Sequence, residues 1–219
     1  MRRASGVATL ASGLLLLAAA PAVADVINGT SGGDVLVGTS GEDTFHGRAG
    51  SDVMKGRGGR DVFYPGTGDD FMRGGRASYP IADRNTAWSS PGNDVMLAGG
   101  GWDFFRGGKG NDFARLGAGE DTFYGGLGAD TMVASPGRDV FYGGRGSDTM
   151  VDDKGSDVAW PEAGRDNIST GHRDDFLRVE DDGVRDRIDC GPGKHDSVYA
   201  PGGIDPKDTY IGCEDFRDD

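Results

Sequence analysis

Aspartates recur every nine residues through most of the chain, and this spacing is the feature of the sequence that could do chemistry. A row of carboxylates offers oxygen ligands to a hard cation. Nucleophilic catalysis would need a base paired with a nucleophile, and the sequence holds no such paired His/Cys set. The recurring aspartates are Asp34, Asp43, Asp52, Asp61 and Asp70 in a first block, and Asp94, Asp103, Asp112, Asp121, Asp130, Asp139, Asp148, Asp157, Asp166 and Asp175 in a second.

Glycine and apolar side chains keep the same period as the aspartates. A glycine stands two positions before every aspartate except the last, where Arg173 takes its place. Two positions after every aspartate the side chain is apolar, as in Phe123 and Met132. Each nonapeptide therefore predicts a glycine-rich turn closed by aspartate, followed by a very short strand with one inward residue.

The fullest copies of the repeat end at Asp112, Asp130 and Asp148. They resemble the RTX nonapeptide, also called the hemolysin-type calcium-binding repeat, whose pattern is G-G-x-G-x-D-x-U-x. The resemblance covers about two thirds of the chain and implies an all-β fold, a parallel β-roll in which two nonapeptides make one turn. Each copy has three motif glycines, of which the second and third are Gly108 and Gly110, Gly126 and Gly128, and Gly144 and Gly146.

The residue types at the inward positions also repeat every eighteen residues, as expected for a coil with eighteen residues per turn. Phenylalanine occupies this position at alternate repeats, from Phe45 to Phe63 and again from Phe105 to Phe141, while methionine and aliphatic residues fill most of the others. One sheet would then present mostly phenylalanine to a facing sheet of methionine and aliphatic side chains. Rings opposite adaptable thioethers can fill a thin core without voids.

Aspartates eighteen residues apart should lie one above another in such a coil. Stacked carboxylates repel one another, and calcium, which takes six to eight oxygen ligands, suits carboxylates combined with glycine carbonyls. We therefore expect all the aspartates from Asp34 to Asp166, with the six motif glycines, to hold Ca²⁺. The alternative is a metal-free solenoid in which aspartates cap turns.

The turns are expected to differ in affinity, because their glycine content differs. The row from Asp112 to Asp148 has all three motif glycines and predicts the tightest binding, whereas the turns that end at Asp139 and Asp157 have lost the first two. Since the core is thin and the acids repel, binding should be coupled to folding.

The remaining segments complete five predicted regions. Residues 1–24 have the layout of a secretory signal peptide, in preference to a membrane anchor, because the apolar stretch is shorter than a bilayer needs. Residues 25–73 and 91–180 form two β-roll blocks. Residues 74–90 form an irregular insertion, either a loop out of the coil or a break between two rolls. Residues 181–219 resemble a small cap, and a disulfide between Cys190 and Cys213 would staple it.

Composition and motifs narrow the function. A net charge of −13 argues against a nucleic-acid partner, and no second apolar segment is long enough to span a membrane. No nucleophile elbow or zinc-helix motif is present, so we expect no enzyme, no catalytic residues and no organic cofactor. The predicted function is calcium binding by a secreted protein. The alternative is a calcium-rigidified adhesin or surface-assembly protein with a glycan or cell-surface partner, which a flat outer face lined with aromatic residues would favour.

Overall fold

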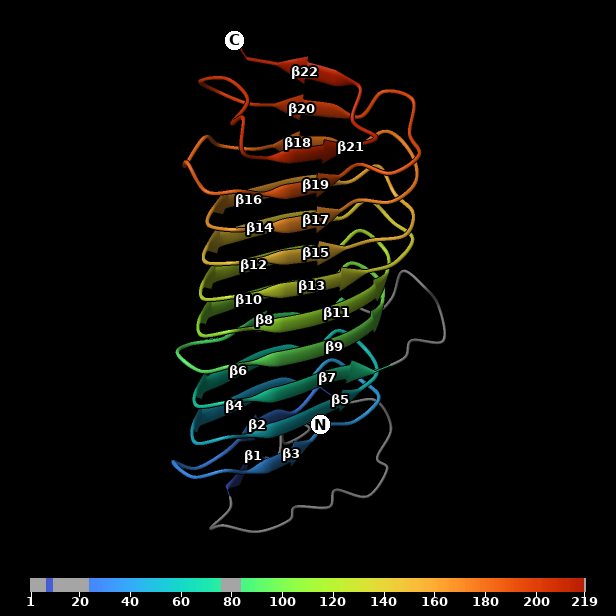
Figure 1. Ribbon diagram of the computed structural model, residues 1–219. Helices are drawn as coiled ribbons and strands as arrows, with labels where there is room; N and C mark the ends of the chain where they lie inside the picture. Colours follow the sequence, from blue (N-terminus) through green and yellow to red (C-terminus); the bar gives the residue numbers. More distant parts are fainter. Residues whose placement is uncertain (1–6, 10–23, 76–83, 219) are drawn as a thin grey trace.

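The chain folds into a coil of short parallel strands. The computed structural model describes residues 7–9, 24–75 and 84–218, and within them it contains strands, turns and no α-helix. Figure 1 shows two facing sheets, with the chain passing from one to the other at every turn. Most of the predicted signal peptide, residues 1–6 and 10–23, lies outside the described residues, so it stays a prediction.

The first sheet carries the phenylalanine side of the core. Among the described residues it has twelve strands, and strands adjacent in the sheet are parallel. In spatial order they are β1 (Val7–Thr9), β2 (Val26–Asn28), β4 (Thr44–Ala49), β6 (Val62–Thr67), β8 (Thr86–Trp88), β10 (Phe104–Lys109), β12 (Thr122–Leu127), β14 (Val140–Arg145), β16 (Val158–Ala163), β18 (Phe176–Arg178), β20 (Ser197–Tyr199) and β22 (Asp215–Arg217).

The second sheet carries the methionine side. It has ten parallel strands within the described ranges, and each lies between two strands of the first sheet along the chain. In spatial order they are β3 (Val35–Val37), β5 (Val53–Arg57), β7 (Phe71–Gly75), β9 (Val95–Gly100), β11 (Phe113–Ala118), β13 (Thr131–Ala134), β15 (Thr149–Val151), β17 (Asn167–Ser169), β19 (Arg187–Asp189) and β21 (Thr209–Ile211).

The register confirms two nonapeptides per turn. Phe105 pairs with Phe123, and Phe123 pairs with Phe141, each eighteen residues further on. Met132 and Met150 pair in the same way in the second sheet. All of these side chains are fully buried, and the rings of Phe105 and Phe123 stack with centroids 5.4 Å apart. The expected core is therefore present, with the predicted inward side chain buried on each of these strands.

Part of the insertion predicted at residues 74–90 belongs to the coil, and the coil is continuous on either side of residues 76–83, which lie outside the described residues. β7 extends through Gly75, and β8 begins at Thr86, so part of residues 74–90 is regular strand. Phe63 pairs with Ala87 and Met72 with Met96, which are offsets of 24 residues. The chain therefore adds six residues in this region without losing the stacking, and no break separates two rolls.

The C-terminal segment, predicted to be a small cap, continues both sheets of the coil. Strands β19 to β22 extend both sheets (Figure 1), but the turns from β19 to β20 and from β20 to β21 are longer than in the repeats. Ile188 pairs with Ile168 twenty residues before it and with Tyr210 twenty-two residues after it. The predicted disulfide is present and joins Cys190, directly after β19, to Cys213, between β21 and β22.

The membrane prediction can be compared with the described residues only. No helix in that part of the chain is long and apolar enough to cross a bilayer.

A candidate metal centre in the turns

Each repeat aspartate lies at the end of a turn, directly before a strand, with its side chain inside the coil. One carboxylate oxygen has a structural task. The Oδ1 atom of Asp130 accepts a hydrogen bond of 2.8 Å from the backbone N–H of Asp112 in the preceding turn, and Asp148 does the same for Asp130. The aspartates therefore hold successive turns together.

These hydrogen bonds join the aspartates into two rows, one at each side of the coil. The first row, called here the Asp130 row, leads into the second sheet, and the other, called the Asp139 row, leads into the first. The Asp130 row contains Asp34, Asp52, Asp70, Asp94, Asp112, Asp130, Asp148, Asp166, Asp186 and Asp208. The Asp139 row contains Asp43, Asp61, Asn85, Asp103, Asp121, Asp139, Asp157, Asp175 and Asp196.

Four members of these rows were missed by sequence reasoning. Asn85 stands eighteen residues before Asp103 and fills the rung beside the insertion, and its period could have identified it. Asp186, Asp196 and Asp208 lie in the C-terminal segment, where the spacing changes to 20, 21 and 22 residues. Period counting fails there because turn length varies while strand stacking does not.

The second carboxylate oxygen of many row aspartates has no such task, although Oδ2 of Asp34 and of Asp43 accepts hydrogen bonds from Thr30 and Thr39. In many of these residues Oδ2 is buried and has no hydrogen-bond partner, which is costly for an ionised group unless a cation or proton neutralises it. Turn capping therefore accounts for only half of each carboxylate. This description applies to Asp52, Asp70, Asp112, Asp121, Asp130, Asp139, Asp148, Asp166 and Asp186.

In several turns of the Asp130 row, including those of Asp112, Asp130 and Asp148, this oxygen faces a space created by glycine. Pro65, Ser89 and Pro161 take that position before Asp70, Asp94 and Asp166. A Cβ atom on Gly125, the first motif glycine, would lie 2.4 Å from Oδ2 of Asp130 and 2.6 Å from the carbonyl oxygen of Gly143 in the next turn. Gly143 has the same relation to Asp148, at 2.5 Å. A carboxylate and a carbonyl oxygen thus converge beside a residue without a side chain. Hard oxygen donors of this kind suit Ca²⁺.

The other motif glycines shape the turn itself. Gly126 and Gly128 have φ angles of +116° and +132°, which residues with a side chain rarely adopt. A Cβ on Gly128 would also lie 1.8 Å from the carbonyl oxygen of Gly110 in the preceding turn. These glycines therefore let successive turns stack closely, with their carbonyls next to the aspartate row.

From Asp103 to Asp175 the Asp139 row is built differently, because side chains fill the position of the first motif glycine, which is still glycine before Asp43 and Asp61. Sequence reasoning noticed the loss at only two turns. The structure shows that the side chains at this position are buried one above another along this side of the coil. They are first aliphatic, then a carboxylate and finally a hydroxyl. These residues, five positions before successive aspartates, are Ala98, Leu116, Ala134, Asp152 and Thr170.

Burial shifts the titration of both rows. Desolvation raises the pKa of Asp112 and Asp148 to about 7 and that of Asp166 to about 8, and the backbone hydrogen bond from the preceding turn only partly opposes it. In the Asp139 row the pKa of Asp139 rises to about 9, again mainly by desolvation. At neutral pH the carboxylates of the metal-free roll therefore resist ionisation.

A ladder of aromatic rings runs along the outer face of the first sheet. Neighbouring ring centroids lie between 4.3 and 6.0 Å apart, and Tyr124 and Tyr142 stack face to face. Tyr64 and Trp88 are each 40% exposed, so the ladder is open to solvent. Its members are His46, Tyr64, Trp88, Phe104, Tyr124, Tyr142 and Trp160.

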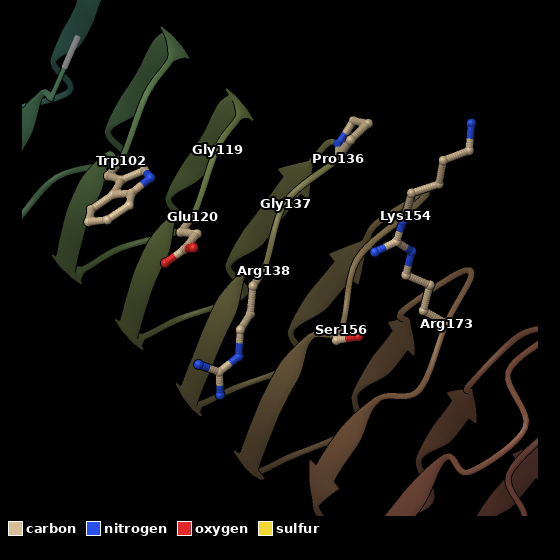
Figure 2. Close-up of a pocket in the computed structure, with 9 residues that line it drawn as sticks. All are labelled: Trp102, Gly119, Glu120, Pro136, Gly137, Arg138, Lys154, Ser156 and Arg173. Atoms are coloured by element: carbon tan, nitrogen blue, oxygen red, sulfur yellow. The ribbon is translucent and has the colours of Figure 1, made fainter. Parts of the chain in front are cut away.

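A hollow of about 540 Å³ lies over the outer side of the turns that carry the Asp139 row. Figure 2 shows its side chains on successive turns, with Trp102 at one end and the cationic groups of Arg138, Lys154 and Arg173 towards the other. Glu120 is the acidic residue that lines it. This local positive charge contrasts with the negative charge of the whole chain.

Comparison with protein families agrees with this geometry. A model of the RTX calcium-binding nonapeptide repeat matches residues 28–63, 37–72, 82–114, 99–132, 115–150, 133–168 and 142–177. These overlapping matches together cover more than half of the chain. A comparison with curated proteins gives no match.

Proposed function

The chain belongs to the family of RTX calcium-binding nonapeptide repeats, and from this premise we propose that it is a secreted protein whose roll folds when it binds Ca²⁺. The residues that hold the ions are the aspartates of the two rows predicted from the sequence, with Gly108, Gly110, Gly126, Gly128, Gly144 and Gly146 shaping the turns. The ion would neutralise the carboxylates and draw successive turns together.

The observation that carries the proposal is the unpartnered Oδ2 atom, repeated from turn to turn. Asp112, Asp130 and Asp148 each bury this oxygen beside the first glycine of their own repeat, and at Asp130 and Asp148 a backbone carbonyl converges on the same glycine. Without a cation, ionisation of such a stack costs free energy at every rung. Calcium removes that cost, so folding and binding are coupled.

Secretion is supported by the disulfide and by the predicted signal peptide. Disulfides form and persist in oxidising compartments outside the cytosol, and Cys190 and Cys213 are joined. Extracellular calcium modules bind commonly near 10⁻⁴ to 10⁻³ M, and we propose that average range for the roll. The cation would then act as a folding signal after export.

A calcium titration followed by far-UV circular dichroism tests the proposal. In excess chelator the protein should be largely disordered, and calcium should restore a β-sheet spectrum cooperatively. A protein that is already β-rich in chelator would disprove coupled folding. A protein that binds no calcium by isothermal titration calorimetry would disprove the proposed function itself.

A second candidate function is adhesion to an extracellular glycan by the calcium-rigidified rod. The aromatic ladder favours it, because exposed aromatic rings and phenol hydroxyls on a flat sheet offer both apolar contact and hydrogen bonds to sugars. The cationic hollow around Arg138 adds a site for acidic groups.

Co-sedimentation with insoluble polysaccharide, one neutral and one acidic, tests adhesion in the presence of calcium. The double substitution Tyr124→Ala and Tyr142→Ala should reduce binding. A matched control removes Val133 and Val151, which lie on the outer face of the second sheet. Equal polysaccharide binding by both variants, or no binding by the wild type, would contradict the adhesion function and leave calcium binding as the single proposed function.

A further inference from the structure

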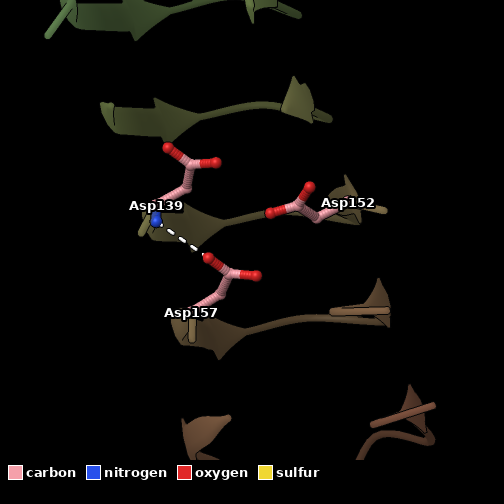
Figure 3. Close-up of side chains that lie close together, drawn as sticks. All are labelled: Asp139, Asp152 and Asp157. Carbon is pink, nitrogen blue, oxygen red and sulfur yellow. Dashed lines mark hydrogen bonds between the residues drawn. The ribbon is translucent and has the colours of Figure 1, made fainter. Parts of the chain in front are cut away.

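The turn that ends at Asp157 departs from the repeat in a way that creates a different set of ligands. Asp152 takes the position of the first motif glycine, directly after β15, and its side chain is buried. Asp139 and Asp157 precede β14 and β16, which are neighbours in the first sheet. Figure 3 shows the carboxylate of Asp152 directed at the space beside the two stacked aspartates.

We infer that Asp139, Asp152 and Asp157 form a divalent-cation site of three carboxylates, distinct from the glycine-lined turns. One oxygen from each residue lies within 4.8 Å of the other two. The exposed fractions of the three residues are 0%, 7% and 1%, so water cannot solvate them freely. The inference rests on the proposed calcium function and assigns it a second kind of site.

The hydrogen bonds leave three oxygens without partners. The backbone N–H groups of Asp121, Asp139 and Asp153 donate to the Oδ1 atoms of Asp139, Asp157 and Asp152 respectively. Each Oδ2 atom remains buried with no hydrogen-bond partner. Every one of the three side chains is therefore held in place by one oxygen and offers the other.

No positive side chain neutralises this cluster. The nearest lysine along the turn is Lys154, whose Nζ lies 3.7 Å from the exposed carboxylate of Asp153. None of the ion pairs found among the described residues includes Asp139, Asp152 or Asp157. A bound cation is the remaining way to keep all three carboxylates ionised.

The chemistry of the ligands selects the ion. Three carboxylate oxygens favour a hard cation and disfavour zinc, which prefers histidine and cysteine. The affinity of calcium sites depends on the number of charged ligands. A turn with three carboxylates should therefore bind Ca²⁺ more tightly than a turn with one carboxylate and carbonyls, despite having lost two motif glycines.

Calcium titration of three variants of the full chain by isothermal titration calorimetry tests the inference. Asp152→Gly restores the repeat consensus, Asp152→Asn keeps the shape of the side chain, and Asp153→Asn removes a neighbouring exposed charge as the control. The first two should weaken the tightest binding step at least tenfold, and the control should leave it unchanged.

The outcomes separate the possible failures. If the wild type binds calcium but both Asp152 variants keep its tightest step, the three-carboxylate site is wrong and the proposed function stands. If Asp152 instead shares a proton with Asp157, Asp152→Asn will keep both affinity and thermal stability, which also overturns the inference. In crystals grown with Mn²⁺, an anomalous peak among the three carboxylates would locate the ion, and a map with no peak there would contradict it.

Discussion

At the scale of single residues, the two carboxylate oxygens of a repeat aspartate have different roles. In Asp130, Oδ1 fixes the preceding turn and Oδ2 is left beside Gly125. The glycine matters as much as the acid, because a side chain there would occupy the space that the ion needs. The two positions therefore depend on each other within one repeat.

Replacement of Gly125 by alanine should lower calcium affinity about tenfold, or roughly 1.4 kcal/mol at that turn. The new Cβ would lie 2.4 Å from Asp130 Oδ2 and would have to displace the carboxylate. Gly100→Ala is a matched control, since its Cβ would meet nothing closer than 3.6 Å. Calcium isotherms of both variants check this, and equal affinities would contradict it.

Arg173 is the one residue that breaks the glycine pattern two positions before an aspartate, and it keeps the glycine backbone. Its φ is +97°, a conformation that costs a side-chain-bearing residue about 1–2 kcal/mol. Arg173→Gly should therefore raise stability by about 1 kcal/mol in calcium-saturated urea unfolding. Arg138→Gly, on the same hollow but without positive φ, should not stabilise, and a gain there would point to charge instead of strain.

At the scale of elements, the strands are short and uniform while the turns vary. Six extra residues beside β8 and longer turns around β19 to β21 leave the pairing intact. Parallel strands in a coil contact only their neighbours, so a longer turn is accommodated locally. The last coils have lost the glycine repeats, and the disulfide ties them together.

Removal of the disulfide should destabilise these last coils first. Cys190 and Cys213 are 23 residues apart, and closing a loop of that length is worth about 3 kcal/mol in the chain-entropy model. In the paired variant Cys190→Ser and Cys213→Ser, hydrogen exchange should speed up in β19 to β22 while β12 stays protected. Uniform loss of protection along the whole coil would contradict this prediction.

At the scale of the whole molecule, the core is a thin layer of side chains between two facing sheets and is flanked by two buried acidic rows. Both sheets are continuous from β2 and β3 to the C-terminal strands. Apolar burial alone is limited in so thin a coil, whereas the acidic rows run its full length. The state of the carboxylates should therefore control the whole fold.

Acid should partly replace calcium. The pKa of Asp112, Asp148 and Asp166 is raised from 3.8 to about 7 or 8 in the fold, so protonation favours the folded state. That stabilisation is fully present below the unfolded value of 3.8 and is lost as the pH rises through 7 to 8. In chelator, circular dichroism should show more β-structure near pH 4.5 than at pH 8. An increase in β-structure with rising pH would contradict it.

The amino-acid sequence by itself determined the repeat, the two-repeat turn and the identity of the inward residues. This was possible because a nine-residue period with alternating Phe123-type and Met132-type positions leaves only one way to stack parallel strands in register. It also indicated the cysteine pair. The family match over residues 28–177 agrees with that interpretation.

Only the tertiary structure decided how each carboxylate divides its oxygens and what lies beside it. The hydrogen bond from Asp112 to Asp130 and the meeting of Asp152 with Asp139 and Asp157 join residues 5 to 18 positions apart. The direction of each of these side chains depends on the backbone conformation of its turn and on the side of the coil at which that turn lies. The spacing of aspartates along the chain determines which residues stack in a row. Which oxygens can bind an ion depends on distances between neighbouring turns, and these are set by the tertiary structure.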